Sequence, residues 1–222
     1  MSNSTHGEVS FDKEYYRRFF KSYNQEEFKI YENWFRGWEK FIFDRIYKNG
    51  QENVLEIGCS IGAFSKILKA KGLDVTATDI SEYILSKAKK LQKDINFEFF
   101  DIEKTKSDQK YDLIFAFEVF EHLNDPKKAL SNVYRLLNNG GQFIFSTPFP
   151  SKQSLADPTH INVHKPSWWL QAGRKAGFKK RTHTYVTFVP LLYRYSQFLS
   201  WGFPLKLDLP YINSTSMFFF KK

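Results

Sequence analysis

The sequence predicts an α/β fold: a doubly wound, mostly parallel seven-stranded sheet with helices on both faces, after an N-terminal helical extension. Three observations predict it. Short apolar runs alternate with helical patterns through most of the chain. Capping residues and glycines stand where those helices should begin and end. The 222 residues, 42% of them hydrophobic, suffice for one sizeable core. Ligands of such sheets bind beyond the carboxyl ends of the strands.

Residues 1–50 differ in texture from the rest of the chain. They begin polar and then mix charged with aromatic side chains, which are spaced three and four residues apart from Tyr15 to Phe41. This spacing favours helices with one buried aromatic face. We expect a helical extension over residues 1–50 and one domain over residues 51–222.

Three strands and two helices are expected in the first half of the domain. The strands are predicted at residues 54–57, 73–78 and 95–100, and the first helix at residues 63–71. Gly72 ends that helix, because glycine readily adopts the left-handed conformation of a helix C-terminus. Ser81 caps the second helix, whose apolar side chains from Ile84 to Leu91 fall on one stripe.

The second half continues the alternation. Asp125 and Pro126 supply the N-cap and first-turn proline of a helix that the segment from Asn138 to Gly141 stops. Ser167 caps a further helix that runs to Ala176. Strands are predicted at residues 111–117, 142–146, 185–188 and 216–220.

The composition restricts partners and compartment. A formal net charge of +9 favours partners that carry phosphate, carboxylate or anionic lipid groups. A single Cys excludes an internal disulfide framework. The first residues lack the apolar run of a secretory signal, and no window reaches the apolar length of a membrane-spanning helix. We therefore expect a cytoplasmic protein.

A glycine turn follows the first predicted strand. The segment reads Glu56-Ile57-Gly58-Cys59-Ser60-Ile61-Gly62, and a helical pattern resumes immediately after it. Glycine allows backbone to approach a ligand closely, and the helix N-terminus favours a ligand carboxylate or phosphate. Asp79 ends the second strand about 20 residues later, where a carboxylate can accept hydrogen bonds from ribose hydroxyls. The two features together predict a nucleoside ligand.

The turn does not match a dinucleotide site. Ser60 and Ala63 stand where two glycines of Gly-x-Gly-x-x-Gly would be. Glu56 would repel a pyrophosphate, but it suits the ammonium and sulfonium charges of S-adenosylmethionine. The segment from Val54 to Gly62 resembles the first motif of class I S-adenosylmethionine-dependent methyltransferases, with Ser60 in place of a usual glycine.

This resemblance implies a Rossmann-like fold, S-adenosyl-L-methionine as cofactor and S-adenosyl-L-homocysteine as product. Asp79 resembles the ribose-binding acid of the family, and Asp101 resembles the acid that holds the adenine amino group. Tyr15 and Tyr16 can cap the cofactor from the N-terminal segment, or only pack in the core. The cofactor-binding residues expected from the resemblance are Glu56, Gly58, Cys59, Gly62, Asp79, Ile80, Asp101, Ile102, Phe117 and Glu118.

The end of the fourth strand should meet the substrate. Residues 115–123 resemble the Glu-Val-Leu-Glu-His-Leu segment of small-molecule methyltransferases, including those of quinone biosynthesis. The resemblance places Phe117 and Glu118 beside the cofactor and His122 near the methyl group, with Glu121 at the surface. A hydroxyl acceptor must lose its proton, and His122 is a candidate base because histidine titrates near neutral pH. A bond to the backbone is its alternative role.

A second cluster follows the fifth strand. Residues 157–160 resemble the Asp-x-Thr-His loop of methyltransferases that modify sugars and related metabolites, which makes His160 a rival or companion base to His122. Asp157, His160 and His164 have donor atoms for a metal ion. No metal site is predicted, because methyl displacement needs no Lewis acid.

An insertion at residues 188–212 separates the last two predicted strands. It is rich in Leu, Tyr and Phe and contains Trp201, Arg194 and Lys206. Such a segment suits a substrate cover for a hydrophobic or lipid-linked acceptor and permits peripheral contact with a membrane. The alternative is that the aromatic side chains pack onto the sheet.

The expected function is methyl transfer to a hydroxyl, or less readily an amine, of a small metabolite, sugar or quinone-like or lipid-like acceptor. One alternative is a nucleic-acid methyltransferase, suggested by the net charge and by Lys179-Lys180-Arg181. The Asp/Asn-Pro-Pro-aromatic motif that is usual in nucleic-acid methyltransferases is absent after the fourth strand, so no DNA partner is expected. The other is a non-catalytic scaffold that binds the cofactor. The oligomeric state is left open.

Overall fold

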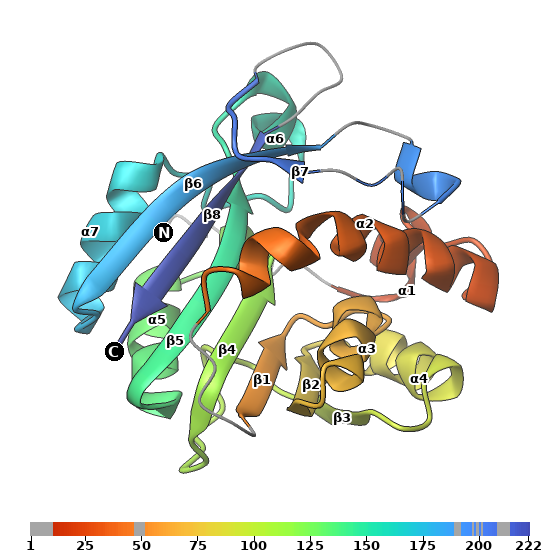
Figure 1. Ribbon diagram of the computed structural model, residues 1–222, viewed down its shortest axis with the longest axis horizontal. Helices are drawn as coiled ribbons and strands as arrows, with labels where there is room; N and C mark the ends of the chain where they lie inside the picture. Colours follow the sequence, from red (N-terminus) through yellow and green to blue (C-terminus); the bar gives the residue numbers. More distant parts are fainter. Residues whose placement is uncertain are drawn as a thin grey trace, which may run out of the picture.

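The computed structural model describes residues 11–46, 52–188, 192–196, 198, 200, 202–207 and 214–222, which build an eight-stranded sheet (Figure 1). The spatial order of the strands is β3-β2-β1-β4-β5-β8-β6-β7. Pairing is parallel from β3 through β5, whereas β8 is antiparallel to both β5 and β6. The strands are β1 Asn53–Ile57, β2 Asp74–Asp79, β3 Asn96–Phe99, β4 Tyr111–Phe117, β5 Leu137–Pro148, β6 Lys180–Phe188, β7 Gly202–Phe203 and β8 Ser214–Lys221.

Helices cover both faces of this sheet. One face carries α2, α3 and α4, and the other carries α5 and α7 (Figure 1). The helices are α1 Lys13–Arg17, α2 Gln25–Phe43, α3 Ala63–Ala70, α4 Glu82–Leu91, α5 Pro126–Leu136, α6 Lys152–Ala156 and α7 Pro166–Ala176, with 3-10 turns η1 Phe120–His122 and η2 Leu192–Arg194. No helix in the described part of the chain combines the length and apolarity needed to cross a membrane.

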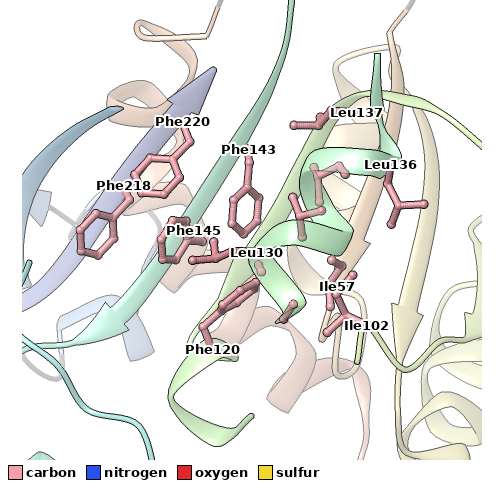
Figure 2. Close-up of a cluster of buried hydrophobic side chains, with 14 of the residues drawn as sticks. Ile57, Ile102, Phe120, Leu130, Leu136, Leu137, Phe143, Phe145, Phe218 and Phe220 are labelled. Atoms are coloured by element: carbon pink, nitrogen blue, oxygen red, sulfur yellow. The ribbon is translucent and has the colours of Figure 1, made fainter. Parts of the chain in front are cut away.

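The strand period of two divides the core into two layers. Alternate strand residues such as Phe143, Phe145 and Phe220 pack with Leu130 of α5 on one face, as Figure 2 shows. Their neighbours, such as Phe115 and Ile144, pack on the other face with the helices that follow and precede β1. The central strands are therefore buried on both faces, as expected for a doubly wound sheet.

The predicted fold class is confirmed, but the strand count is eight rather than seven. The additional strand is β7, which pairs with the end of β6 through only two residues. It comes from the 188–212 insertion, whose composition carried no strand pattern. The helices expected before residue 50 are α1 and α2, while the domain boundary itself falls on residues 47–51, outside the described residues.

Two local predictions were wrong. Ser167 does not cap α7, because Lys165 is the N-cap and Pro166 occupies the first helical turn. The helix α5 does end before the segment from Asn138 to Gly141, at Leu136, but β5 begins at Leu137 rather than at the predicted Gln142, so this segment lies within the strand, beside a shift in the register with β4. In addition, β6 begins five residues before the predicted run at Tyr185, because its polar first half pairs with β8 through backbone hydrogen bonds.

Candidate cofactor and acceptor site

A cavity of about 960 Å³ lies at the carboxyl ends of β1, β2, β3 and β4. It brings together residues that the sequence separates by more than 60 positions. Eight of the ten predicted cofactor-binding residues line it, namely Gly58, Cys59, Asp79, Ile80, Asp101, Ile102, Phe117 and Glu118. His122 lines it as well. The predicted edge of the sheet is therefore one concave site.

The glycine turn brings backbone to the cavity wall. Gly58 has φ +73°, and a Cβ built on it would lie 2.3 Å from Cγ2 of Val119. This left-handed backbone and the nearby Val119 side chain both favour glycine at this position. Ser60, which replaces a family glycine, has φ 51° and still lines the cavity. Its backbone N–H donates to Oδ2 of Asp79 at 3.0 Å, which helps to hold the strained turn.

Asp79 is the anchor of the site. Its carboxylate accepts the backbone N–H groups of Ser60 and Ser81 and the phenol of Tyr16, whose oxygen lies 3.2 Å from Oδ1. Burial raises the pKa of Asp79, and these hydrogen bonds oppose that effect. Tyr16 thus brings the N-terminal segment against the cavity wall and is itself buried in the core, while its role as a cap on the cofactor stays a prediction.

Two predicted cofactor residues do not line the cavity. Glu56 faces α3, where its carboxyl accepts the hydroxyl of Ser65, and burial raises its pKa to about 8. The strand period explains this correction, because Glu56 shares the face of Val54, which packs against the α2 and α3 helices. Gly62 serves packing: a Cβ there would lie 2.6 Å from the ring of Phe97.

The next two acids along the sheet edge have defined partners. Asp101 is buried, and its Oδ1 accepts the backbone N–H of Glu103 at 2.8 Å. Glu118 has φ 54°, and its Oε1 accepts the hydroxyls of Ser146 and Thr215 at 2.6 and 2.7 Å. Burial raises the pKa of Glu118, with the two hydroxyls opposing. Both carboxyl groups are held in single positions on the cavity wall.

His122 and His160 lie together, although only His122 reaches the cavity. Their ring centroids are 4.9 Å apart. His122 Nδ1 lies 2.9 Å from the carbonyl oxygen of Thr159, and His160 Nδ1 lies 2.8 Å from that of Ser154. Burial lowers the pKa of His122 to about 4, which keeps its imidazole neutral. The two histidines, predicted as rival or companion bases, therefore lie next to each other, and only His122 lines the cavity.

Glu121 is the clearest miss of the sequence reading. It was expected at the surface, but its exposed fraction is 0%. Both of its carboxylate oxygens are buried without a hydrogen-bond partner among the described residues. Burial raises the pKa of Glu121 well above its usual range. Its inward position in the turn η1 has no signature in the sequence.

The cover of the cavity comes from the N-terminal segment. Phe11, Tyr15, Phe19 and Phe20 line it, and Arg18 ties this segment to the 157–164 loop through a 2.9 Å ion pair with Asp157. None of the described residues of the 188–212 insertion lines the cavity. They lie against α2 instead, as when Asn33 donates to the carbonyl of Tyr193. The lid expected from that insertion stays a prediction, because part of the insertion lies outside the described residues.

Asp157 and His164 do not join the two histidines around a common point. Asp157 is held by Thr159 and Arg18. Burial raises its pKa, but the hydrogen bonds from Thr159 and the charges of His160 and Arg18 outweigh this effect and lower the pKa to about 2. His164 stacks on Trp168 with ring centroids 3.8 Å apart. The donor atoms that do converge belong to Glu121, His122 and His160.

Comparison with known proteins supports the family that the sequence motifs resemble. A family model described as a methyltransferase domain matches residues 29–183, more than half of the chain. The ubiquinone biosynthesis O-methyltransferase of Coxiella burnetii is 37% identical over 113 residues, which cover 49% of this chain and 48% of that protein. Malonyl-[acyl-carrier protein] O-methyltransferase 1 of Ilyobacter polytropus is 36% identical over 129 residues, 54% of this chain and 48% of that protein. The chain thus spans about half the length of these curated relatives.

A solved structure extends the similarity over nearly the whole fold. Phosphoethanolamine N-methyltransferase 2 of Haemonchus contortus, in complex with S-adenosyl-L-methionine, superposes with a TM-score of 0.66 at 16% identity. The match covers 96% of this chain and 60% of that one. At this identity the likeness concerns the fold. Together with the family match and the geometry of the glycine turn and Asp79, it shows that the chain belongs to the methyltransferase-domain family, the class I S-adenosylmethionine-dependent methyltransferases.

Proposed function

We propose that this chain transfers a methyl group from S-adenosylmethionine to a hydroxyl of a small apolar acceptor. The observation that carries the proposal is one cavity that joins the glycine turn, the acid that ends β2, the acid that follows β3, and His122. A non-catalytic cofactor scaffold would not need a neutral imidazole on the wall of that cavity.

The cavity fits the cofactor of the family. Gly58 leaves the turn open for close approach, since a Cβ there has no room beside Val119. Asp79 would accept the ribose hydroxyls, and Asp101 would hold the adenine amino group between Ile80 and Ile102. When bound, the cofactor supplies a methyl group on a positively charged sulfur, which leaves as a neutral thioether. The leaving group therefore requires no acid from the protein.

His122 would prepare the acceptor. The carbonyl of Thr159 can only accept a hydrogen bond, so His122 Nδ1 carries the proton and its Nε2 keeps a lone pair. That lone pair can take the proton of a hydroxyl as its oxygen attacks the methyl carbon. The carbonyl of Ser154 holds His160 Nδ1 in the same way, and the neighbouring His160 ring would support the ring of His122.

The lining favours an apolar, ring-containing acceptor. The rings of Phe11 and Tyr15 lie 5.5 and 6.3 Å from the ring of His122, both edge-on. Phe35 and Trp34 lie along the same cavity. Aromatic walls bind a flat apolar ring through burial and edge-to-face contacts, which a sugar would satisfy less well. The likeness to an enzyme named for ubiquinone biosynthesis supports the same acceptor class.

A methyl-transfer screen tests this proposal. Purified protein is incubated with radiolabelled methyl donor and fractionated metabolite extracts, and label is expected in an apolar fraction. His122→Ala should lose transfer while it retains binding of S-adenosylhomocysteine, and His160→Ala should retain more activity. His164→Ala is the matched control on the same loop. Label confined to nucleic acid, or transfer that survives in both His122→Ala and His160→Ala, would contradict the proposal.

A further inference from the structure

A second cavity lies between α2 and the described part of the 188–212 insertion. Its volume is about 630 Å³, which is within the range of small-molecule sites. The side chains that give it its chemistry are Glu26, Lys29 and Asn33 of α2 and Arg194, Tyr195 and Phe198 of the insertion. Tyr31, Trp34 and Phe35 of α2 line the cofactor cavity instead. The helix therefore separates two cavities that share no described lining residue.

Asn33 is the observation that calls for a ligand in this second cavity. Its side chain amide lies on the cavity wall, yet the residue is only 4% exposed. Its Nδ2 donates to the carbonyl oxygen of Tyr193 at 3.0 Å, which fixes the other end of the amide as the acceptor. That acceptor, Oδ1, has no hydrogen-bond partner among the described residues. A buried acceptor without a donor is costly, so a ligand that supplies an N–H or O–H group is favoured.

Positive charge is in excess around the same cavity. Lys29 and Arg194 line it together with a single carboxylate, that of Glu26. Lys29 Nζ lies 3.9 Å from Glu32, but two other cations share that carboxylate at 3.2 and 3.4 Å. Arg194 is exposed and forms no ion pair within the described part of the chain. The cavity therefore favours one anionic group, and Glu26 disfavours a chain of several phosphates.

Two exposed aromatic rings border the cavity. Tyr195 is 82% exposed and Phe198 is 76% exposed. Their backbones are held, because the N–H of Tyr195 donates to the carbonyl of Leu192 and that of Phe198 donates to the hydroxyl of Ser196. A planar ring that stacks on such side chains removes apolar surface from water on both partners. The border of the cavity thus suits a flat ring.

We propose that the second cavity binds a small phosphate ester that carries a planar ring with an N–H or O–H donor, as a nucleoside monophosphate does. Lys29 and Arg194 would pair with the phosphate. Tyr195 and Phe198 would contact the ring, and Oδ1 of Asn33 would accept the donor. Because the two cavities share no described lining residue, this ligand and S-adenosylmethionine can be bound at the same time. The site is independent of the methyl acceptor.

Calorimetric titration with adenosine monophosphate (AMP) tests the site. The purified chain is first saturated with S-adenosylhomocysteine, which keeps the nucleotide out of the cofactor cavity. One equivalent of AMP per chain should then bind. Adenosine lacks the phosphate and inorganic phosphate lacks the ring, so each should bind at least tenfold more weakly than AMP.

Matched variants locate the binding. Arg194→Gln removes a cation of the cavity and Tyr195→Ala removes a ring from its border, so each should weaken AMP binding at least fivefold. Both side chains are exposed, and the fold does not depend on their burial. Lys69→Gln removes an exposed cation of α3 that lines neither cavity, and Leu192→Ala removes an exposed apolar side chain of η2 outside the cavity. Both controls should bind AMP as the wild type does.

The outcomes separate the site from the proposed function. Absence of saturable AMP binding in the presence of S-adenosylhomocysteine overturns the inference, and so does binding of inorganic phosphate as tight as that of AMP. Unchanged binding in Arg194→Gln and Tyr195→Ala, or an equal loss in Lys69→Gln, also overturns it, because the net charge of the chain would then hold the nucleotide. Near-ultraviolet circular dichroism shows that each variant is folded. A chain that binds AMP as expected but methylates no acceptor would refute the proposed function and leave this site standing.

Discussion

Replacing Asp79 with Asn tests how the site holds its cofactor. The carboxylate now accepts two backbone N–H groups, each at 3.0 Å, and the phenol of Tyr16. Asn keeps the shape of the side chain but has a single acceptor oxygen and no charge. Hydrogen bonds to charged groups contribute about 1.5 to 3 kcal/mol each. Loss of the charged ribose contact should therefore cost about 2 kcal/mol, which corresponds to roughly 30-fold weaker binding.

Isothermal titration calorimetry with S-adenosylhomocysteine measures this loss. Asp74→Asn is the matched control, because Asp74 begins the same strand β2 but is exposed. The control should bind with wild-type affinity. Circular dichroism of both variants reports whether the sheet is intact. If folded Asp79→Asn binds within threefold of the wild type, Asp79 does not hold the ribose and the reasoning from the sheet edge fails.

Three further predictions address the turn, the buried acid and the cover. Gly58→Ala should weaken binding of S-adenosylhomocysteine more than tenfold, because the added Cβ would lie 2.3 Å from Val119 and φ is +73°. Calorimetry on this variant and on the double variant Gly58→Ala, Val119→Ala checks the prediction. Wild-type affinity in the single variant would refute it. Glu56 has a folded-state pKa of about 8, above its ordinary 4.5, so protonation of this carboxyl favours the fold fully below about pH 4.5 and progressively less up to pH 8. Urea unfolding at pH 5 and pH 8 should show a smaller loss of stability in Glu56→Gln than in the wild type, and equal losses would contradict the assignment. Arg18→Ala should change the free energy of unfolding by less than about 1 kcal/mol, because its ion pair with Asp157 is partly exposed. A loss above about 2 kcal/mol in the same assay would contradict this and mean that the contacts of Arg18 hold the cover.

The strands and helices around the sheet could be predicted because the sequence features that determine them are local. The strand β4 has the predicted bounds, Tyr111 to Phe117, and α5 begins at Pro126 with Asp125 as its N-cap, as predicted. Ser81 caps α4 through the N–H of Ile84. Apolar runs, caps and first-turn prolines act within a few residues, so the sequence displays them directly.

Side-chain positions that depend on contacts between distant segments were harder to predict from the sequence. The cover depends on Tyr16 reaching Asp79 and on Arg18 reaching Asp157, contacts between segments 63 and 139 residues apart. Glu121 lies inward because the 157–164 loop closes over η1, where the backbone N–H of Asn162 donates to the carbonyl of Glu121. No local pattern encodes either contact.

The orientation of Glu56 could have been inferred from the sequence. Glu56 was assigned to the cofactor from its charge and from its resemblance to a family motif, but in a strand the side chains of Val54 and Glu56 share a face. That face packs on α3, where Ser65 meets the carboxyl. Strand periodicity therefore carried the information that the motif alone did not.

The central claim is that the cavity at the sheet edge binds the methyl donor. A crystal structure of the protein grown with S-adenosylhomocysteine tests it most directly. The account predicts the nucleoside within the cavity, its ribose hydroxyls within hydrogen-bond distance of Asp79 and its sulfur directed toward His122. A ligand bound elsewhere on the chain, or an empty cavity at saturating ligand, would contradict it.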